Sequence, residues 1–313
     1  MTTAALSFSP RLVRVGQTAA TIGLLAFLWQ IADGPETARI LTTAEPVWLL
    51  AGFLALTIQT VLSAMRWQLT AAQLGIKLPQ MHALREYYLA QLVNQAVPGG
   101  VVGDAARAVR SRDQVGLIAS GQAVVFERLA GQIAMFVTMA VAFLATLLAP
   151  GGFEWPAWLV PPILLVILAG TLTPFAGFVA TQLPGRVGVI IKRQWLTLGK
   201  ALTERNVLLR QIVLSLGTVF CNLAAFAFCA HAVGVALQPI IVLALVPLIL
   251  FTMLVPITIS GWGVREGAAA ALLPLAGVSA SQGFAASIAF GLVLFVAVLP
   301  GFLVLWRQAD EDS

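Results

Sequence analysis

The chain has 313 residues, of which 59% are hydrophobic and only 10% are charged. In soluble proteins, about a quarter of all residues are charged. The formal net charge of +5 does not indicate nucleic-acid binding, because the basic residues are segregated along the chain. Apolar stretches long enough to cross a hydrocarbon core of ~30 Å recur along the whole length. Since backbone polar groups in lipid must be paired within their own segment, we expect an all-α, polytopic membrane protein with a single membrane domain over residues 1–313.

Six apolar stretches are predicted to be full transmembrane helices. In chain order they cover residues 15–31, 47–65, 120–148, 158–180, 211–233 and 282–306. We expect the first stretch to be retained in the mature protein. It lacks a convincing small-residue cleavage site and is longer than the apolar region of a usual signal peptide.

A short apolar stretch at residues 87–97 lies between the second and third spans. It ends in Pro98, Gly99 and Gly100, Gly103 follows, and arginines flank it on both sides. Proline removes a backbone donor and glycine permits a sharp turn. The pattern therefore predicts a re-entrant hairpin over residues 85–115, which enters and leaves the membrane on one side. The alternative is eight plain helices, some of them kinked at proline.

A second broken stretch covers residues 239–276. Its first part ends in Pro256, and Gly261 and Gly263 enclose Trp262 before a short apolar piece. The flanking connections contain no Lys or Arg, so we expect a re-entrant hairpin from the opposite face. The order span, hairpin, span then occurs twice, in halves at residues 47–180 and 210–306. Paired breaks of this kind are typical of an inverted repeat with a site near the membrane midplane.

The basic residues predict the orientation. They gather before the first span, around the first hairpin, after the last span and in the connection at residues 184–210, where apolar residues at helical spacing suggest an interfacial helix or a plain surface linker. The connections on the other side hold only Arg39, amid acidic residues. By the positive-inside rule, both termini are expected in the cytoplasm.

No enzyme motif is complete. Asp104 and Arg107 resemble the start of a CDP-alcohol phosphotransferase motif, but the paired downstream aspartates are missing. Ser260 is next to a glycine, as intramembrane serine proteases require, but His231 is predicted to lie on the wrong side of the hairpin. The two cysteines and two histidines have no metal-ligand spacing. The sequence thus predicts no catalysis, no metal and no cofactor.

Charged residues inside the predicted membrane region are the strongest functional signal. They are Glu127 and Arg128 in the third span, Arg265 and Glu266 at the second break, and Asp104 and Arg107 at the first. Each ionisable group at depth costs at least ~2.5–3.5 kcal/mol on insertion scales. Two interpretations stay open, and they are compatible: an ion-pair network that pins the hairpins, or a polar cavity whose arginines bind a phosphate. Because adjacent helix positions point about 100° apart, Glu127 and Arg128 are expected to pair with groups elsewhere.

Two sets of residues resemble one known family. The first comprises Arg66-Trp67, Tyr88, Asn94, residues 98–100, Gly103-Asp104, Arg107, Glu127-Arg128-Leu129 and Gly131, and the second residues 261–266 with Gly277. Together they resemble the flippase-like membrane domain of bacterial lysylphosphatidylglycerol synthases and its stand-alone relatives, over about residues 47–306. The chain departs from the family pattern at Ser260, where a second glycine is usual, and at Trp262, where an aliphatic residue is common. The aminoacyl-transferase domain of the synthases is absent, so synthetic activity is not implied.

The resemblance implies a lipid translocator in the bacterial cytoplasmic (inner) membrane, which moves a phosphate-bearing, anionic lipid through a polar midplane cavity. The candidate substrate-binding residues are Arg66, Asn94, Asp104, Arg107, Glu127, Arg128, Trp262, Arg265 and Glu266. We expect Arg128 and Arg265 to face one shared cavity, where Glu127 and Glu266 neutralise them when it is empty. The alternatives are an ion-coupled transporter of a small soluble anion and a membrane-embedded lipid-modifying enzyme.

Overall fold

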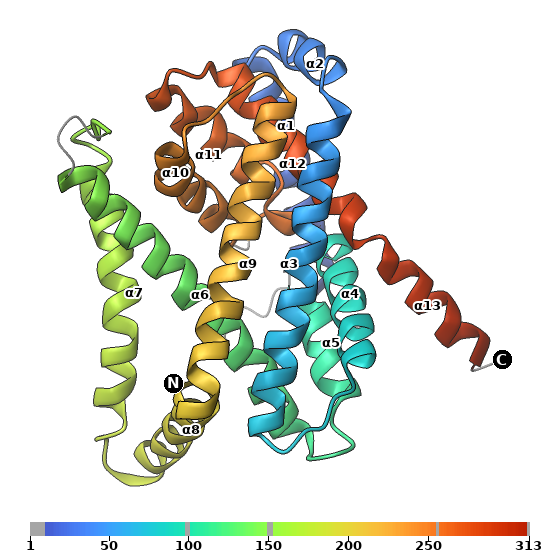
Figure 1. Cartoon of the computed structure of the whole chain (residues 1–313), viewed down its shortest axis with the longest axis vertical. Coiled ribbons are helices and arrows are strands. Elements are labelled where there is room, and N and C mark those ends of the chain that lie inside the picture. Colours follow the sequence, from blue (N-terminus) through green and yellow to red (C-terminus); the bar gives the residue numbers. More distant parts are fainter. Residues whose placement is uncertain (1–9, 98–100, 149–152, 255–256, 312–313) are drawn as a thin grey trace.

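A computed structural model of the chain describes residues 10–97, 101–148, 153–254 and 257–311 (Figure 1). All regular elements within these residues are helical. Five helical segments are long and apolar enough to cross a membrane: α3 (Pro46–Gln73), α6 (Leu117–Leu148), α7 (Val160–Ala180), α9 (Arg205–Ala232), and Ala280–Trp306, which joins α12 (Ala280–Val298) to the start of α13 (Pro300–Glu311). Each coincides with a predicted span, so the chain is an all-helical, multi-pass membrane protein.

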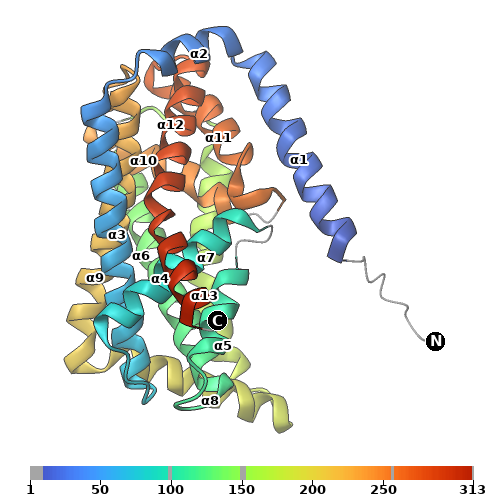
Figure 2. The same cartoon turned by 90° about the vertical axis from the view of Figure 1, so that its right-hand side faces the viewer.

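The first predicted span, at residues 15–31, lies within α1 (Pro10–Ile31). α1 leads into α2 (Gly34–Thr42) with a bend of 91°, as in a broken span or a re-entrant loop, so the described residues contain five spans, or six if this pair is counted as one. The bend follows from the local sequence, because Asp33 adopts a left-handed conformation with φ of 52° and its side chain accepts a hydrogen bond from the backbone N–H of Glu36. In Figure 2, α2 lies across one end of the molecule and α1 descends from it along the side.

Two broken segments pack among the long helices. The first consists of α4 (Gln80–Ala96) and α5 (Val102–Arg110), and the second of α10 (Pro239–Phe251), two 3-10 turns (η1, Thr252–Leu254; η2, Ile259–Gly261) and α11 (Val264–Leu272), which the 3-10 turn η3 (Leu273–Ala276) follows. Figure 1 shows α4 and α5 in one half of the molecule and α10 and α11 in the other. The helix breaks fall where the sequence predicts them; the re-entrant course and the inverted repeat stay predictions.

The backbone geometry at the helix breaks explains why glycine occupies these positions. A Cβ on Gly103 would lie 2.0 Å from the carbonyl oxygen of Ala90, so α4 and α5 approach each other too closely for any side chain there. Gly261 and Gly263 have φ of 78° and 89°, in the region that favours glycine. The predicted break residues Pro98, Gly99, Gly100 and Pro256 lie outside the described residues.

The largest apolar core lies between the second broken segment and the helices around it. α3 and α9 run side by side (Figure 1), and residues of α9, α10 and α12 form one buried cluster that includes Phe226, Leu245, Ile249 and Phe290. α10 is apolar on all sides, as expected for a helix enclosed by protein. This packing positions both broken segments beside the long helices that carry the polar residues described below.

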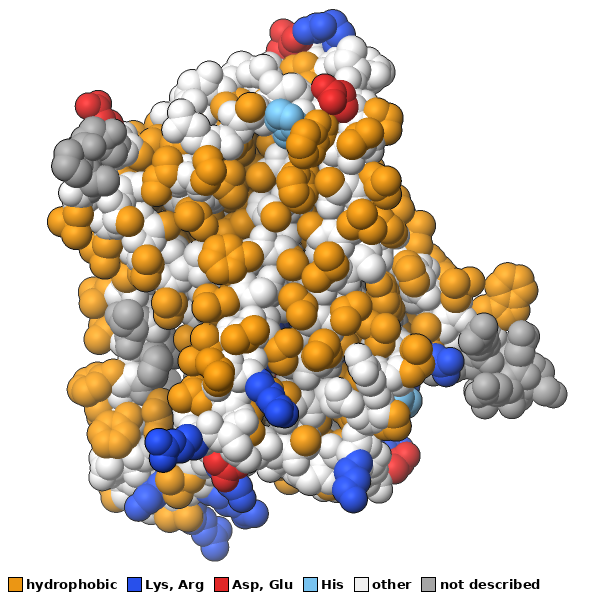
Figure 3. Space-filling view, viewed as in Figure 1, with side chains coloured by type: hydrophobic (Ala, Val, Ile, Leu, Met, Phe, Trp, Pro, Cys, Tyr) orange, Lys and Arg blue, Asp and Glu red, His pale blue; other side chains and the backbone are white. Residues whose placement is uncertain are grey.

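The two ends of the molecule differ in charge. The exposed basic residues gather at the end where α8 (Gly185–Thr203) lies, which we call the basic end (Figure 3). It includes Lys77, Arg186, Lys192, Arg193, Arg205 and Arg210. The opposite end, at α2, carries Glu36, Arg39 and Glu45. The predicted interfacial connection at residues 184–210 is thus helical over most of its length.

Candidate functional site

A polar cavity of about 230 Å³ lies between α3, α4, α6, α9, α10 and η1; we call it the central cavity. Its polar lining residues are Gln59, Ser63, Arg66, Tyr87, Glu127, Arg128, Gln132, Thr218 and Asn222. Polar residues of α3 and α9 recur three or four positions apart, at 59, 63, 66 and 70 and at 211, 215, 218 and 222. Residues at this spacing share one face of a helix, so each helix turns a polar stripe toward the interior.

Glu127 of α6 lies at the centre of a buried charge network. Its side chain is fully buried, and its Oε1 accepts hydrogen bonds from Arg66 Nη2 at 2.6 Å, Arg66 Nε at 3.1 Å and the Tyr87 hydroxyl at 3.3 Å. Its Oε2 accepts from Arg107 Nη2 at 3.3 Å. Three different helices, α3, α4 and α5, therefore direct donors to one carboxylate, which is the arrangement that a buried charge needs.

Asp104 extends the network to the first helix break. Its Oδ1 accepts from Arg107 Nη2 at 2.9 Å, and its Oδ2 accepts from Asn94 Nδ2 at 2.8 Å and from Arg128. Asn94 also accepts from the backbone N–H of Gly103 at 2.8 Å, so it ties the end of α4 to the start of α5. We call Arg66, Asp104, Arg107, Glu127 and Arg128 the first charge network; three arginines face two carboxylates, which leaves one excess positive charge.

Arg107 is fully enclosed, as Glu127 is. Its guanidinium carbon lies 4.4 Å from the centre of the Trp67 ring and 4.5 Å from that of Tyr87, within cation–π distance of both. The side chain is fully buried, and its Nε and Nη1 have no hydrogen-bond partner among the described residues. Arg128 differs, because its side chain is 38% exposed and lines the central cavity.

A second cluster surrounds Arg265 at the start of α11. Arg265 donates to Glu266 and, through Nε at 3.1 Å, to the hydroxyl of Ser287 on α12, while Glu266 accepts from the backbone N–H of Gly263 at 2.6 Å. The guanidinium carbon lies 5.1 Å from the Trp262 ring and 5.3 Å from the Phe290 ring. This buried and well-paired cluster fastens α11 to α12.

The structure divides the nine candidate binding residues between two clusters, whereas the sequence hypothesis placed Arg128 and Arg265 at one shared cavity. Arg66, Asn94, Asp104, Arg107, Glu127 and Arg128 form one connected network, whereas Arg265, Glu266 and Trp262 form the other. Among the described residues, those that line the central cavity include Arg128 but not Arg265. Arg128 forms an ion pair with Asp104, while Glu127 pairs with Arg66 and Arg107.

The two helix breaks nevertheless meet. The hydroxyl of Ser260 in η2 donates a hydrogen bond of 2.6 Å to the side-chain oxygen of Gln95 at the end of α4. Sequence reasoning missed Gln95, Tyr87 and Thr218 as contributors to the site. The regular spacing of polar residues along α9 was the signal that could have identified Thr218. In the part of the chain that the structure describes, no group of three or more His, Cys, Asp or Glu could hold a metal ion.

Comparison with known proteins agrees with this picture. The family model described as the Lysylphosphatidylglycerol synthase TM region matches residues 12–301 and thus includes both clusters and both breaks. No curated protein matches the chain. The family model confirms the resemblance that the paired motifs of the sequence indicate. The chain belongs to the family of the lysylphosphatidylglycerol synthase transmembrane region, a family of membrane proteins associated with lipids.

Proposed function

We propose that the protein moves a lipid with a phosphate-bearing headgroup between the two leaflets of the bacterial cytoplasmic membrane, and that the headgroup crosses through the central cavity. One observation carries the proposal: a charge network with one excess positive charge borders a polar cavity between apolar helices. A phosphate cannot cross ~30 Å of hydrocarbon unaided, because it would lose its hydration without compensation. Fixed guanidinium donors supply that compensation.

The depth of the network supports this role. Glu127 lies ten residues after Leu117, the first residue of α6, which corresponds to about 15 Å along a helix axis. That distance is about half of a ~30 Å hydrocarbon core. If α6 enters the membrane near its first residue, Glu127 and Arg128 lie near the midplane, where the barrier for a charged headgroup is highest.

Arg128 is the residue that we assign to the phosphate. Arg66 and Arg107 donate to the buried Glu127, whereas the side chain of Arg128 is 38% exposed, lines the central cavity and donates to Asp104. Asp104 would hold Arg128 while no lipid is bound. An arriving phosphate would share or replace that carboxylate as acceptor, since guanidinium presents forked donors to either group.

The two clusters also support the inverted repeat. In each, an arginine on the helix after the break lies within cation–π distance of two aromatic rings: Arg107 in α5 and Arg265 in α11. In each, the long helix that follows contributes a polar residue and, four positions later, a glycine that makes room for a guanidinium. These pairs are Glu127 with Gly131, which adjoins Arg66, and Ser287 with Gly291, which adjoins Arg265.

We further propose that both termini and the basic end face the cytoplasm, as the positive-inside rule requires, and that the protein is a transporter without catalytic activity. The broken segments would then enter from opposite faces of the membrane. The N-termini of α5 and α11, which carry the positive ends of the helix dipoles, would lie at the two breaks and favour an anion. The rival function is ion-coupled transport of a small soluble anion, because the same arginines could bind either ligand.

Transport by Arg128 variants in proteoliposomes tests the proposal. Leaflet exchange of a fluorescent phosphatidylglycerol is followed by quenching from outside with a membrane-impermeant reductant. We expect Arg128→Ala to slow exchange at least about tenfold, since a hydrogen bond to a charged group contributes ~1.5–3 kcal/mol. Arg128→Lys should be intermediate, because it keeps the charge but loses the forked donors. Arg110→Ala is the matched control, since Arg110 pairs with Glu86 and does not line the cavity.

A charge swap separates transport from folding. Arg128→Asp combined with Asp104→Arg should restore the ion pair and normal expression without restoring exchange. Full exchange in Arg128→Ala would contradict the phosphate role. Proteoliposomes that exchange no labelled lipid but take up radioactive inorganic phosphate would establish the rival function instead.

A further inference from the structure

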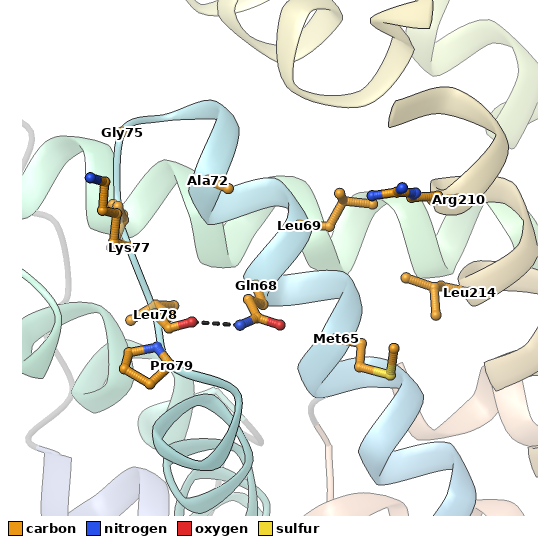
Figure 4. Close-up of a pocket in the computed structure, with 11 residues that line it drawn as sticks. Met65, Gln68, Leu69, Ala72, Gly75, Lys77, Leu78, Pro79, Arg210 and Leu214 are labelled. Carbon is orange, nitrogen blue, oxygen red and sulfur yellow. Dashed lines mark hydrogen bonds between the residues drawn. The ribbon is translucent and has the colours of Figure 1, made fainter. Parts of the chain in front are cut away.

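A second and larger cavity, of about 650 Å³, lies at the basic end of the molecule. Met65, Leu69 and Ala72 of α3, the loop at residues 75–79, and Arg210 and Leu214 of α9 line it (Figure 4). Its lining is mostly apolar, and we call it the basal groove. Met65 adjoins Arg66, but neighbouring helix positions point about 100° apart, so the basal groove and the central cavity lie against different faces of α3.

The wall of the basal groove is held in place by side-chain hydrogen bonds. Gln68 Nε2 donates to the carbonyl of Leu78 at 2.5 Å (Figure 4). Gln114, in the connection after α5, accepts from the backbone N–H of Lys77 at 2.9 Å and donates to the carbonyl of Lys77 at 3.1 Å. Within this loop, the side chain of Ile76 is buried. The groove is therefore a formed feature of the fold, and binding there requires little ordering of the loop.

Charge at the groove is unbalanced. Arg210 and Lys77 are exposed, and no ion pair among the described residues neutralises either of them. In Figure 4, the guanidinium of Arg210 lies beside Leu69, while Lys77 stands on the opposite wall and points outward. A cation at one end of an apolar groove complements an anionic phospholipid, whose phosphate lies at the end of its acyl chains. A basic residue near a membrane surface contributes about 1 kcal/mol to the attraction of anionic lipid.

We propose that the basal groove binds one anionic phospholipid from the leaflet at the basic end. Arg210 contacts the phosphate, Lys77 adds attraction at the rim, and an acyl chain lies along Met65, Leu69 and Leu214. A small soluble anion has no apolar group to contact this apolar lining, and a zwitterionic lipid carries no net negative charge to complement Arg210. The site does not depend on the transport that we propose for the central cavity.

Photocrosslinking in nanodiscs tests the proposal. Leu69 is replaced by the photoreactive p-benzoylphenylalanine, and the protein is embedded in a bilayer of phosphatidylglycerol and phosphatidylcholine in equal amounts. Mass spectrometry then counts the two lipid adducts. We expect phosphatidylglycerol adducts to exceed phosphatidylcholine adducts about fivefold, the ratio that one basic residue near the headgroup supports.

Arg210→Ala in the same background should bring the two adducts to near equality, while Lys77→Ala should lower the ratio less. Arg205→Ala is the matched control, because Arg205 is an exposed arginine of the same helix that does not line the groove, and it should leave the ratio unchanged. Arg128→Ala should also leave it unchanged, whatever its effect on transport. Equal adducts in the parent protein, or an equal loss with Arg205→Ala and Arg210→Ala, would overturn the proposal.

Discussion

Ser260 combines an unfavourable backbone conformation with a contact between the two broken segments. Its φ of 52° and ψ of 24° lie in the left-handed region, which costs a residue with a side chain roughly 1–2 kcal/mol. Related sequences are expected to carry glycine there, which avoids that cost. In this chain, the serine hydroxyl donates to Gln95, and a typical intramolecular hydrogen bond contributes ~0.5–1.5 kcal/mol. The contact offsets much of the strain and links the second break to the end of α4.

Substitutions of Ser260 should therefore separate the two effects. Ser260→Ala loses the hydrogen bond and keeps the strain, so we expect a loss of about 1 kcal/mol in the free energy of unfolding. Ser260→Gly loses the bond but relieves the strain, and its stability should stay near that of the parent protein. Thermal unfolding in mild detergent measures both. Equal stability of the two variants would contradict the strain, and a Ser260→Ala variant as stable as the parent protein would contradict the contribution of the bond to Gln95.

At the scale of helices, the polar stripes of α3 and α9 face each other, and we call their contact the polar seam. Thr218 Oγ1 accepts from Arg66 Nη1 at 2.9 Å, which fixes the arginine that pairs with Glu127. One turn earlier, the buried hydroxyl of Ser215 has no partner among the described residues. An unsatisfied buried hydroxyl is destabilising, whereas a hydrogen bond to a charged group is strong. Two neighbouring residues of one stripe thus have opposite effects on stability.

We expect Thr218→Ala to lower the free energy of unfolding by about 1.5–3 kcal/mol, because it takes an acceptor from a buried guanidinium. Ser215→Ala should be neutral or stabilising by up to about 1 kcal/mol, because it removes a polar atom that lacks a partner. Thermal unfolding of the two variants side by side is the measurement. A larger loss of unfolding free energy for Ser215→Ala than for Thr218→Ala would contradict this assignment of the stabilising contact to Thr218.

The helices and their breaks could be predicted because their signals are local. Hydropathy locates the spans, and glycine at positions such as Gly103 and Gly263 marks where the backbone must turn or approach a neighbour. The pairing of charges could not be predicted, because it depends on how helices cross. The ion pair between Arg128 and Asp104 forms where α5 packs beside α6. Hydroxyls such as that of Thr218 usually bond to their own helix, so the sequence does not reveal the bond to Arg66.

At the scale of the whole molecule, exposed basic residues gather at one end, and the opposite end, at α2, carries acidic residues. The connection that follows each broken segment lies at one of these two ends. Residue 113 lies in the connection between α5 and α6, near the basic end, and residue 279 lies between α11 and α12, at the end of the molecule where α2 lies. The side chain of Asp113 is 88% exposed, and Ser279 is exposed as well. Both positions are therefore accessible to a reagent on the correct side of the membrane.

Cysteine labelling at these two positions tests the orientation of the whole molecule. In a background with Cys221 and Cys229 replaced by alanine, we expect a membrane-impermeant maleimide applied to intact cells to label a cysteine at position 279 but not one at 113. Opening the cells should expose position 113. The reason is that Lys and Arg are retained on the cytoplasmic side, and exposed Lys and Arg gather at the basic end (Figure 3). Labelling of both positions from the same side would rule out opposed broken segments, because one pair of helices would then have to cross the membrane completely.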